Sequence, residues 1–597
     1  MARDNASFSQ KRWSLTELFP EPDGPAMHGA LEELEQRTAA FETLRPQLTP
    51  DLSPGTLLDM LLNIEAIALL SHRLYGYAGL MFAEDTQSQA VQGLVARMDQ
   101  LEAQISNRIL FFSLWWKSLD EENAARLMLY AGEFRYWLEE MRHFKPYTLS
   151  EAEEKVINLK DVTGVSAWHT LYDAITNRYA FKLKVDGRTQ QLTRGEISVY
   201  FRHHDPDLRA RAYRELYRVF AEDSTILGHV YQTLVRDWRN EQIDLRGFAS
   251  PMSVRNLGND IPDTVVDTLL DVCRQNAPLY QRFFRLKAAW LGVNRLRRYD
   301  VYAPVTKADK SYEFADAVDM VLDAFGGFDR QLADMARQVL RADHLDGQVR
   351  KGKRSGAFCW SVAPRLMPWV LVNYQGRPYD VSTLAHELGH AVHGIIASHH
   401  SILTHHAALP LAETASTFGE MLLVERLLGE ESDPSVRHDM LFNQVDDTYA
   451  TIQRQAFFAL FERQAHDMVQ QGSSVDDIAT AYLDNLRSQF GDAVDVSEEF
   501  RWEWVSIPHI YHTPFYVYAY AFGQLLVLSL YRQYRKEGEA FKPRYLGILG
   551  AGGADSPAHI LGAAGIDISQ AEFWQGGFDV VREMIEQLEA IPVGNGE

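Results

Sequence analysis

The amino-acid sequence predicts a mainly α-helical protein, and three observations support this fold class. Apolar residues recur at three- and four-residue spacing over long runs, most clearly in residues 53–82 and 88–119. Helix-starting signals accompany these runs: in "SPGTLL" we expect Ser53 to cap a helix with Pro54 at its first position. Strand signals are few by comparison. We therefore expect long antiparallel helices with only a little β-structure.

Two short stretches predict this β-structure. In "FKLKVDGRTQQLT", residues 181–193, Asp186 and Gly187 separate two alternating runs, a pattern typical of a tight hairpin. In "PWVLVNYQG", residues 368–376, successive side chains alternate between two faces, as they do in a strand. We expect this second stretch to be the edge strand of a small sheet.

The length of the chain indicates more than one packed unit. At 597 residues, of which 46% are hydrophobic, it can form two or more units with a substantial core. The sequence contains no repeat of fixed period, low-complexity tract or obvious linker. From the helix pattern alone we expect a boundary near residue 200, which separates an N-terminal helical domain with a small hairpin (residues 1–200) from a larger domain (residues 201–597).

The charge and cysteine content argue against several functional classes. With 59 basic and 81 acidic residues the formal net charge is -22, which disfavours nucleic acid and anionic membranes as partners. The only cysteines, Cys273 and Cys359, lie outside any Cys-x-x-Cys spacing, so no disulfide framework is indicated. The N-terminal residues lack the apolar core of a signal peptide. We therefore expect a cytoplasmic protein.

One segment tests this expectation. Residues 514–531, "PFYVYAYAFGQLLVLSLY", are about as long and apolar as a short membrane span. They contain four tyrosines, a Gln and a Gly, no charged flank precedes them, and we find no second candidate in the chain. We expect a helix buried in the protein core and no association with a membrane.

The stretch "DVSTLAHELGHAVHGII", residues 380–396, carries the candidate chemistry. We expect Asp380 to cap a helix that begins directly after it, which places His386 and His390 four residues apart on one helix face. Both imidazoles can then reach one metal ion. Glu387 lies next to that face, where its carboxylate can act as a general base on a metal-bound water without being a ligand. The alternative is an amphipathic helix whose histidines only belong to its polar face.

A catalytic zinc site needs a third protein ligand and an open position for water. His393 lies a further turn along the same helix, so it would not converge on the same ion, and the metzincin spacing is not met. Glu413 lies near the start of a second helical segment, so we expect it to be the ligand. Glu420, seven residues later, is expected to orient a ligating histidine. The remaining nearby histidines, His399, His400, His405 and His406, are expected on a surface loop.

Four stretches of this sequence resemble one known family, the thimet oligopeptidase and oligoendopeptidase F group of zinc metallopeptidases. They are "GAFCWSVAPRLMPWVLVNYQGRPYDVSTLAHELGHAVH", "ETASTFGE", "IPHIYHTPFYVYAYAFG" and "AGGADSPAHILGAAGIDISQAEFWQGGFDVV". The last stretch is most similar to the oligoendopeptidase F branch. The resemblance covers most of residues 205–590 well and the N-terminal part more loosely.

The resemblance implies a neurolysin- and thimet-like, clam-shaped helical fold with a deep central channel and a small β-sheet beside the active-site helix. It implies that residues 201–597 form the zinc metallopeptidase catalytic domain and that residues 1–200 form one wall of the channel. By the family's motif the chain binds one Zn2+ through three ligands, and Glu387 is the catalytic base. The ligands are His386, His390 and Glu413.

The family also places one histidine and two tyrosines near the scissile carbonyl. By the resemblance these catalytic residues are His509, Tyr511 and Tyr518. Because "HIYHTPFY" allows a one-residue shift in the alignment, His512 remains an alternative to His509. A tyrosine phenol is neutral at pH 7 and could donate a hydrogen bond to the oxyanion.

We therefore expect a zinc-dependent endopeptidase of short unstructured peptides. In this reaction Glu387 accepts the proton of the attacking water and passes it to the leaving amine. The strand in residues 368–376 would hold the extended peptide by main-chain hydrogen bonds. Two alternatives remain open, a carboxypeptidase-like metallo-exopeptidase and a catalytically silent peptide-binding protein. The presence of Glu387 argues against a silent protein, whereas oligomeric state and peptide preference are not predicted.

Overall fold

The computed structural model describes residues 8–305 and 310–591, which form two compact units. Unit 1 contains the described residues 8–146, 310–430 and 533–566. Unit 2 contains residues 147–305, 431–532 and 567–591. Helices dominate both units and the strands form three small sheets, so the predicted mainly α fold class is confirmed. The predicted limit of a catalytic domain near residue 200 is not defined by packing alone and stays a prediction.

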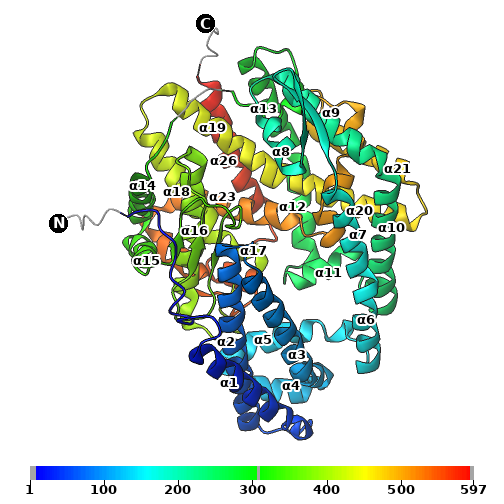
Figure 1. The fold of residues 1–597 in the computed structure, drawn as a ribbon, viewed down its shortest axis with the longest axis vertical. Coiled ribbons are helices and arrows are strands. Elements are labelled where there is room, and N and C mark those ends of the chain that lie inside the picture. Colours follow the sequence, from blue (N-terminus) through cyan, green and yellow to red (C-terminus); the bar gives the residue numbers. More distant parts are fainter. Residues whose placement is uncertain (1–7, 306–309, 592–597) are drawn as a thin grey trace, which may run out of the picture. The chain divides into compact units, whose positions relative to one another are not determined.

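The first segment of unit 1 contains three long α-helices and two short ones, which pack side by side (Figure 1). These helices are α1 (Pro25–Glu42), α2 (Pro54–Glu84), α3 (Gln89–Ser118), α4 (Glu121–Met128) and α5 (Arg135–His143). The predicted start of α2 is confirmed, because the Ser53 side chain accepts a hydrogen bond from the Thr56 N–H. Apolar side chains such as Leu61 and Leu80 of α2 and Trp116 of α3 lie in one buried core.

The other segments of unit 1 contribute the helices of the candidate site and a three-stranded sheet. The helices are α14 (Phe314–Phe328), α15 (Arg330–Arg341), α16 (Pro378–Ile396), α17 (Leu409–Ala412), α18 (Thr414–Glu430), α24 (Lys542–Gly550) and α25 (Pro557–Ala563). The strands are β4 (Leu345–Asp346), β5 (Phe358–Trp360) and β6 (Trp369–Leu371). Because α16 packs against β5 and β6, the predicted sheet beside this helix is confirmed.

The prediction that residues 368–376 form an edge strand is wrong. The strand order is β4-β6-β5, so β6 is the central strand, parallel to β4 and antiparallel to β5. Its backbone groups are therefore shared with two neighbours, and all three of its residues are buried. The second neighbour, β4, has only two residues, too few to show an alternating pattern in the sequence. The edge strand that packs on α16 is β5.

Unit 2 contains the predicted hairpin, formed by β1 (Phe181–Val185) and β2 (Arg188–Leu192). Its turn residues Asp186 and Gly187 both have positive φ, as the Asp-Gly turn requires. Its first helices are α6 (Glu151–Thr163), α7 (Val165–Asn177), α8 (Arg194–Ser198), α9 (Pro206–Glu222), α10 (Ser224–Trp238), α11 (Pro251–Gly258), α12 (Asp263–Gln275) and α13 (Ala277–Trp290). The later elements are α19 (Pro434–Thr448), α20 (Arg454–Gln470), α21 (Val475–Phe490), α22 (His509–His512) and α26 (Ala571–Glu589), with β3 (Leu296–Arg297) paired to β7 (Val494–Asp495).

Helix α23 (Tyr518–Glu537) continues from unit 2 into unit 1, where unit 1 resumes at residue 533. Leu525, Leu526 and Leu528 are fully buried, so the expectation of a core helix in this segment is confirmed. In the described part of the chain, the helix long and apolar enough to cross a membrane is α2, with 33% of its apolar window buried. Core helices of soluble proteins pass the same test. The expectation that residues 514–531 are the only such segment is therefore wrong.

Candidate active site

The helix that carries the two central histidines begins earlier than the sequence predicts. α16 starts at Pro378, so the expected start after Asp380 is wrong by three residues. Asp380 still stabilises this end, because its Oδ2 accepts hydrogen bonds from the N–H groups of Gln375 at 2.9 Å and Arg377 at 3.0 Å. A carboxylate in the first turn can satisfy unpaired N–H groups just as a residue at the cap does. The helix face that presents the histidines is unaffected by this shift.

Three predicted ligands come together in unit 1. His386 and His390 lie on one face of α16, and Glu413 lies between α17 and α18. The Nε2 atoms of both histidines are 3.3 Å from Oε2 of Glu413. One ligand atom of each residue lies within 4.8 Å of the others, and all three residues are partly exposed. This arrangement suits a metal that keeps one coordination position open.

Glu420 contacts the first histidine from the other side, as predicted. Oε1 of Glu420 is 2.6 Å from Nδ1 of His386. When a metal is bound, a carboxylate at Nδ1 would favour the tautomer that carries the proton there and leave the lone pair of Nε2 for the ion. Glu420 therefore fixes both the ring orientation and the protonation of His386.

The electrostatics of this cluster suit a bound cation. Burial lowers the pKa of His386, but hydrogen bonds with Glu413 and Glu420 outweigh this effect and raise the pKa well above the ordinary value. Burial likewise opposes ionisation of Glu413, whereas His386 and His390 bring the pKa of that carboxyl far below its usual range. The carboxylates of Glu413 and Glu420 thus concentrate negative charge around His386, which favours its protonated form. Because metal ligands bind in their deprotonated form, a divalent cation could take the place of this proton.

Glu387 lies on α16 beside the cluster but is not one of its three ligand groups. Only 6% of its surface is exposed. Burial raises the pKa of Glu387, and the neighbouring His386 and His390 reduce this shift. A carboxylate with a raised pKa holds a proton more firmly than an exposed one, which suits a general base that must return its proton.

The other histidines near α16 do not join the ligand group. His393 is buried, and burial lowers its pKa to about 4, so it is neutral at physiological pH. His399 and His406 are exposed, as expected for a surface loop, and His400 is partly exposed. The expectation is wrong for His405, which is 3% exposed. Its Nε2 lies 3.0 Å from the Gly394 carbonyl, so this histidine fastens the loop to the end of α16.

The ligand-bearing helices approach each other closely because α16 has a glycine at the contact. A Cβ atom on Gly389 would lie 2.6 Å from Cα of Ser416 and 2.7 Å from the Ala415 carbonyl oxygen. The missing side chain therefore allows the backbones of α16 and α18 to touch. This contact sets Glu413 and Glu420 against the histidines.

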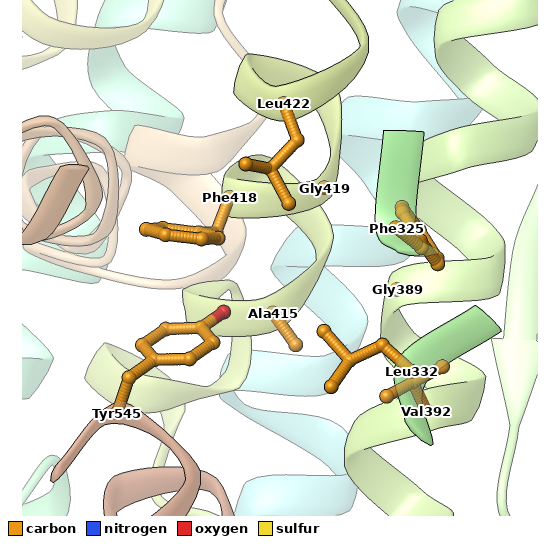
Figure 2. A pocket seen from close by; sticks show the side chains of 9 residues that line it. All are labelled: Phe325, Leu332, Gly389, Val392, Ala415, Phe418, Gly419, Leu422 and Tyr545. Atoms are coloured by element: carbon orange, nitrogen blue, oxygen red, sulfur yellow. The ribbon is translucent and has the colours of Figure 1, made fainter. Parts of the chain in front are cut away.

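A small pocket lies between these helices and their neighbours, and Figure 2 shows the side chains around it. The lining residues are Phe325, Leu332, Gly389, Val392, Ala415, Phe418, Gly419, Leu422 and Tyr545. The hydroxyl of Tyr545 donates to the Thr414 carbonyl at 3.1 Å. The lining is otherwise apolar, and none of the three ligand residues belongs to it. This pocket is part of the helix packing behind His386, His390 and Glu413, and its lining carries no catalytic groups.

The two predicted tyrosines lie in the core of unit 2. Tyr511 and Tyr518 are both 0% exposed. The Tyr511 hydroxyl donates to the Leu227 carbonyl at 3.3 Å, and its ring stacks on Tyr172. The Tyr518 hydroxyl accepts a hydrogen bond from Nδ2 of Asn259 at 2.8 Å. In this conformation both phenols are enclosed by protein.

A different group of aromatic side chains is accessible in the same segment. His509 is exposed, and Tyr516 and Tyr520 are partly exposed. Their ring centroids form a triangle, with His509 5.8 Å from Tyr516 and 6.0 Å from Tyr520, and the two tyrosines 5.2 Å apart. We call these three residues the aromatic cluster. The alternative histidine, His512, instead pairs with Asp173 at 3.0 Å.

The sequence alone does not identify Tyr516 and Tyr520 as the accessible tyrosines, because the alternating run "FYVYAY" does not reveal which of them face outward. α23 begins at Tyr518, so Tyr516 and Tyr520 flank the helix start. The available signal was their four-residue separation, which places two side chains on one side of a helix. That signal becomes readable only when the helix start is known.

Comparisons with known proteins match this chain to a peptidase family. Residues 199–580, more than half of the chain, match the family described as Peptidase family M3, and residues 115–181 match the one described as Oligopeptidase F. Oligopeptidase PepF of Bacillus subtilis is 26% identical over 98% of this chain and 87% of its own length. Group B oligopeptidase PepB of Streptococcus agalactiae is 27% identical, with 98% of each chain covered.

Solved structures of peptidases share the fold of this chain. A peptidase from Chlamydophila abortus superposes with a TM-score of 0.85 at 25% identity, covering 97% of this chain and 98% of its own. Oligoendopeptidase-F from Enterococcus faecium has a TM-score of 0.71 at 22% identity, covering 94% and 99%. The chain therefore belongs to peptidase family M3, as a metalloendopeptidase of the oligoendopeptidase F type.

Proposed function

We propose that this protein is a zinc-dependent oligopeptidase that hydrolyses internal bonds of short, unstructured peptides. The observation that carries the proposal is the convergence of His386, His390 and Glu413 on one point beside the buried Glu387. The family membership supports a metallo-oligopeptidase, and the relatives named above are oligopeptidases.

The donor set fits zinc. Two imidazole nitrogens and one carboxylate oxygen, with a fourth position left open, form the ligand pattern of catalytic zinc sites, whereas magnesium and calcium prefer oxygen ligands alone. His386, His390 and Glu413 would hold one ion per chain, and Glu420 would keep the His386 ring in place. When bound, zinc supplies a polarised water and a Lewis acid for the peptide carbonyl.

Glu387 performs the proton transfers in this proposal. Its carboxylate accepts a proton from the attacking water and then donates it to the nitrogen of the leaving amine. Its position next to both ligand histidines brings it close to the water. The 6% exposure of Glu387 keeps bulk water from competing for the proton.

The substrate would bind as an extra strand on β5. This strand ends the sheet and packs on α16, so its outer edge lies beside the helix that carries the histidines. Main-chain hydrogen bonds to a strand edge do not depend on the substrate's side chains, so broad sequence tolerance follows. A folded protein cannot present an extended segment of this kind, which restricts the substrates to unstructured peptides.

The resemblance also implies hydrogen-bond donors for the oxyanion. The resemblance assigns this work to His509, Tyr511 and Tyr518, and these roles stay predictions. Tyr516 and Tyr520 are better suited by exposure, because Tyr511 and Tyr518 are enclosed and already hydrogen-bonded. We therefore propose the aromatic cluster as the substrate-facing group of this segment. We also propose a cytoplasmic location, consistent with the free thiols of Cys273 and Cys359.

Product analysis tests the proposed function. The zinc-loaded protein is incubated with a defined pool of peptides of about 6 to 20 residues, which can bind as extended strands at ~3.3 Å per residue. The products are then analysed by mass spectrometry. We expect cleavage at internal bonds, loss of cleavage with a zinc chelator, and recovery when zinc is restored. The same segments embedded in a stable folded protein should stay intact. Stepwise trimming from one terminus would instead identify an exopeptidase, and chelator-resistant cleavage would contradict the metal mechanism.

A further inference from the structure

The aromatic cluster is built around a strained β-turn in unit 2. The Tyr516 N–H donates to the Thr513 carbonyl at 3.1 Å, which closes a four-residue turn over residues 513–516. Pro514 occupies its second position, where the ring fixes a negative φ. Phe515 occupies the third position with a φ of 59°. A positive φ there defines a type II turn, which normally has glycine at this position because other side chains are strained.

Two side chains hold the central peptide group of this turn from opposite ends. The Phe515 N–H donates to Oε1 of Glu462, on α20, at 2.9 Å. The Pro514 carbonyl accepts a hydrogen bond from Nε of Arg255, on α11, at 3.1 Å. Type I and type II turns differ mainly by a flip of this one peptide group. In a type I turn the N–H and the carbonyl would exchange directions and lose both partners, whereas Phe515 would lose its strain.

Glu462 is otherwise an unexpected residue for its place. It is 0% exposed, and its second oxygen, Oε2, has no hydrogen-bond partner among the described residues. Burial raises the pKa of Glu462 to about 8, although the Phe515 N–H and Arg255 act in the opposite direction. The carboxyl group is therefore mostly uncharged at neutral pH. Even without a charge, the carboxyl group can accept the hydrogen bond from the Phe515 N–H that the turn directs toward it.

The segment after the turn is fastened by the same helix end. Asn259 directly follows α11, and its Nδ2 donates to the hydroxyl of Tyr518 at 2.8 Å. α11 and its cap thus hold the chain on both sides of Phe515. Tyr516 lies inside the turn, and Tyr520 lies in the first turn of α23. The orientation of the Pro514–Phe515 peptide therefore determines how Tyr516 and Tyr520 are presented beside His509.

We propose that Glu462 and Arg255 are positioning residues that clamp the Pro514–Phe515 peptide in the type II orientation and so fix the aromatic cluster for the reaction. This inference rests on the proposed peptidase function. The clamp contributes to turnover, while substrate affinity and zinc binding are independent of it.

Two substitutions of Glu462 separate this role from general stability. Glu462→Gln keeps an uncharged acceptor of the same shape, so kcat should stay within about threefold of wild type, a difference under 1 kcal/mol. Glu462→Leu fills the site without an acceptor, and we expect kcat to fall by about 10- to 100-fold, the cost of misplacing a reacting group. KM and zinc content should stay unchanged. A Leu variant with wild-type kcat, or a Gln variant as impaired as Leu, would overturn the proposal.

Arg255→Met provides an independent test, because Arg255 is only partly buried and folding should tolerate its loss. It should lower kcat as Glu462→Leu does, and the two losses should not add, since both act on one peptide group. If Glu462→Leu fails to fold, a wild-type kcat in Arg255→Met alone overturns the proposal. Additive losses would also contradict it.

Phe515→Gly supplies the control for strain. Glycine adopts the type II conformation without help, so Glu462→Leu should cost much less kcat in the Phe515→Gly background than in wild type. An equal loss in both backgrounds would contradict a clamp on this turn. Glu387→Gln distinguishes failure of the proposed peptidase function from failure of the clamp alone. If that variant remains active, the proposed function fails, whereas an inactive Glu387→Gln beside a fully active Glu462→Leu removes only the clamp.

Discussion

The candidate metal-binding group of unit 1 (His386, His390 and Glu413) and the aromatic cluster of unit 2 are built on different kinds of backbone. His386 and His390 lie four residues apart on one regular helix, and α18 brings Glu413 and Glu420 to them through a close helix contact. The aromatic cluster instead spans a short helix, a strained turn and the start of α23. Regular helix geometry makes the first group readable from spacing. In the second group one turn conformation decides which side chains are accessible.

The largest effect should follow from removing the two histidines of the candidate metal-binding group. His386→Ala combined with His390→Ala should abolish zinc binding and lower kcat/KM by roughly four orders of magnitude or more, since no activated water is then available. Metal analysis and peptide hydrolysis measure the two effects. His399→Ala, which removes an exposed histidine of the same region, is the matched control. Unchanged zinc content in the double variant would show that His386 and His390 are not zinc ligands.

Removal of single tyrosine hydroxyls in unit 2 tests which phenols take part in the reaction. Tyr516→Phe or Tyr520→Phe should lower kcat by about 100-fold if the phenol stabilises the oxyanion. Tyr518→Phe should mainly lose the hydrogen bond with Asn259, at a cost of about 1 kcal/mol in the free energy of unfolding. Steady-state kinetics and thermal unfolding of the three variants distinguish them. A large kcat loss confined to Tyr518→Phe would instead support the assignment made from the family motif.

A smaller effect is expected at Glu420. Glu420→Ala leaves all three ligands in place but frees the His386 ring, so zinc affinity should fall by about 10- to 100-fold. Competition with a chelating dye measures this affinity. Glu425→Ala, at an exposed position on the same helix, should leave it unchanged. Equal affinities in both variants would mean that the contact does not orient the ligand.

A further effect concerns the pH dependence of stability in unit 2. The pKa of Glu462 is about 8 in the folded chain, against an ordinary value of 4.5. Between these values the folded chain keeps a proton that the unfolded chain releases, so the stability contributed by this group falls as the pH rises. Glu462→Gln removes this dependence. Its Tm relative to wild type should therefore increase between pH 5 and pH 8, and a constant difference would contradict the shifted pKa.

Local sequence signals predicted the regular parts of the molecule. Ser53 caps α2, Asp186 and Gly187 turn the hairpin, and the spacing of His386 and His390 places them on one face. Each of these features depends on a few neighbouring residues.

The features that the sequence did not reveal depend on distant residues. The central position of β6 depends on β4, which pairs with it through only two residues. The outward direction of Tyr516 and Tyr520 depends on the positive φ of Phe515, which Glu462 and Arg255 hold from other helices. No propensity of phenylalanine indicates such a conformation. Burial of His405 likewise depends on its contact with the end of α16.

In the proposed mechanism a metal held by His386, His390 and Glu413 acts together with Glu387. Glu387→Gln tests this cooperation, because the amide keeps the shape of the side chain and removes its ability to accept a proton. Zinc content and kcat are measured on the same purified sample, with the exposed Glu572→Gln as the control. We predict about one zinc per chain and a kcat lower by about 10²- to 10⁴-fold. Near wild-type turnover by the zinc-loaded variant would contradict the account.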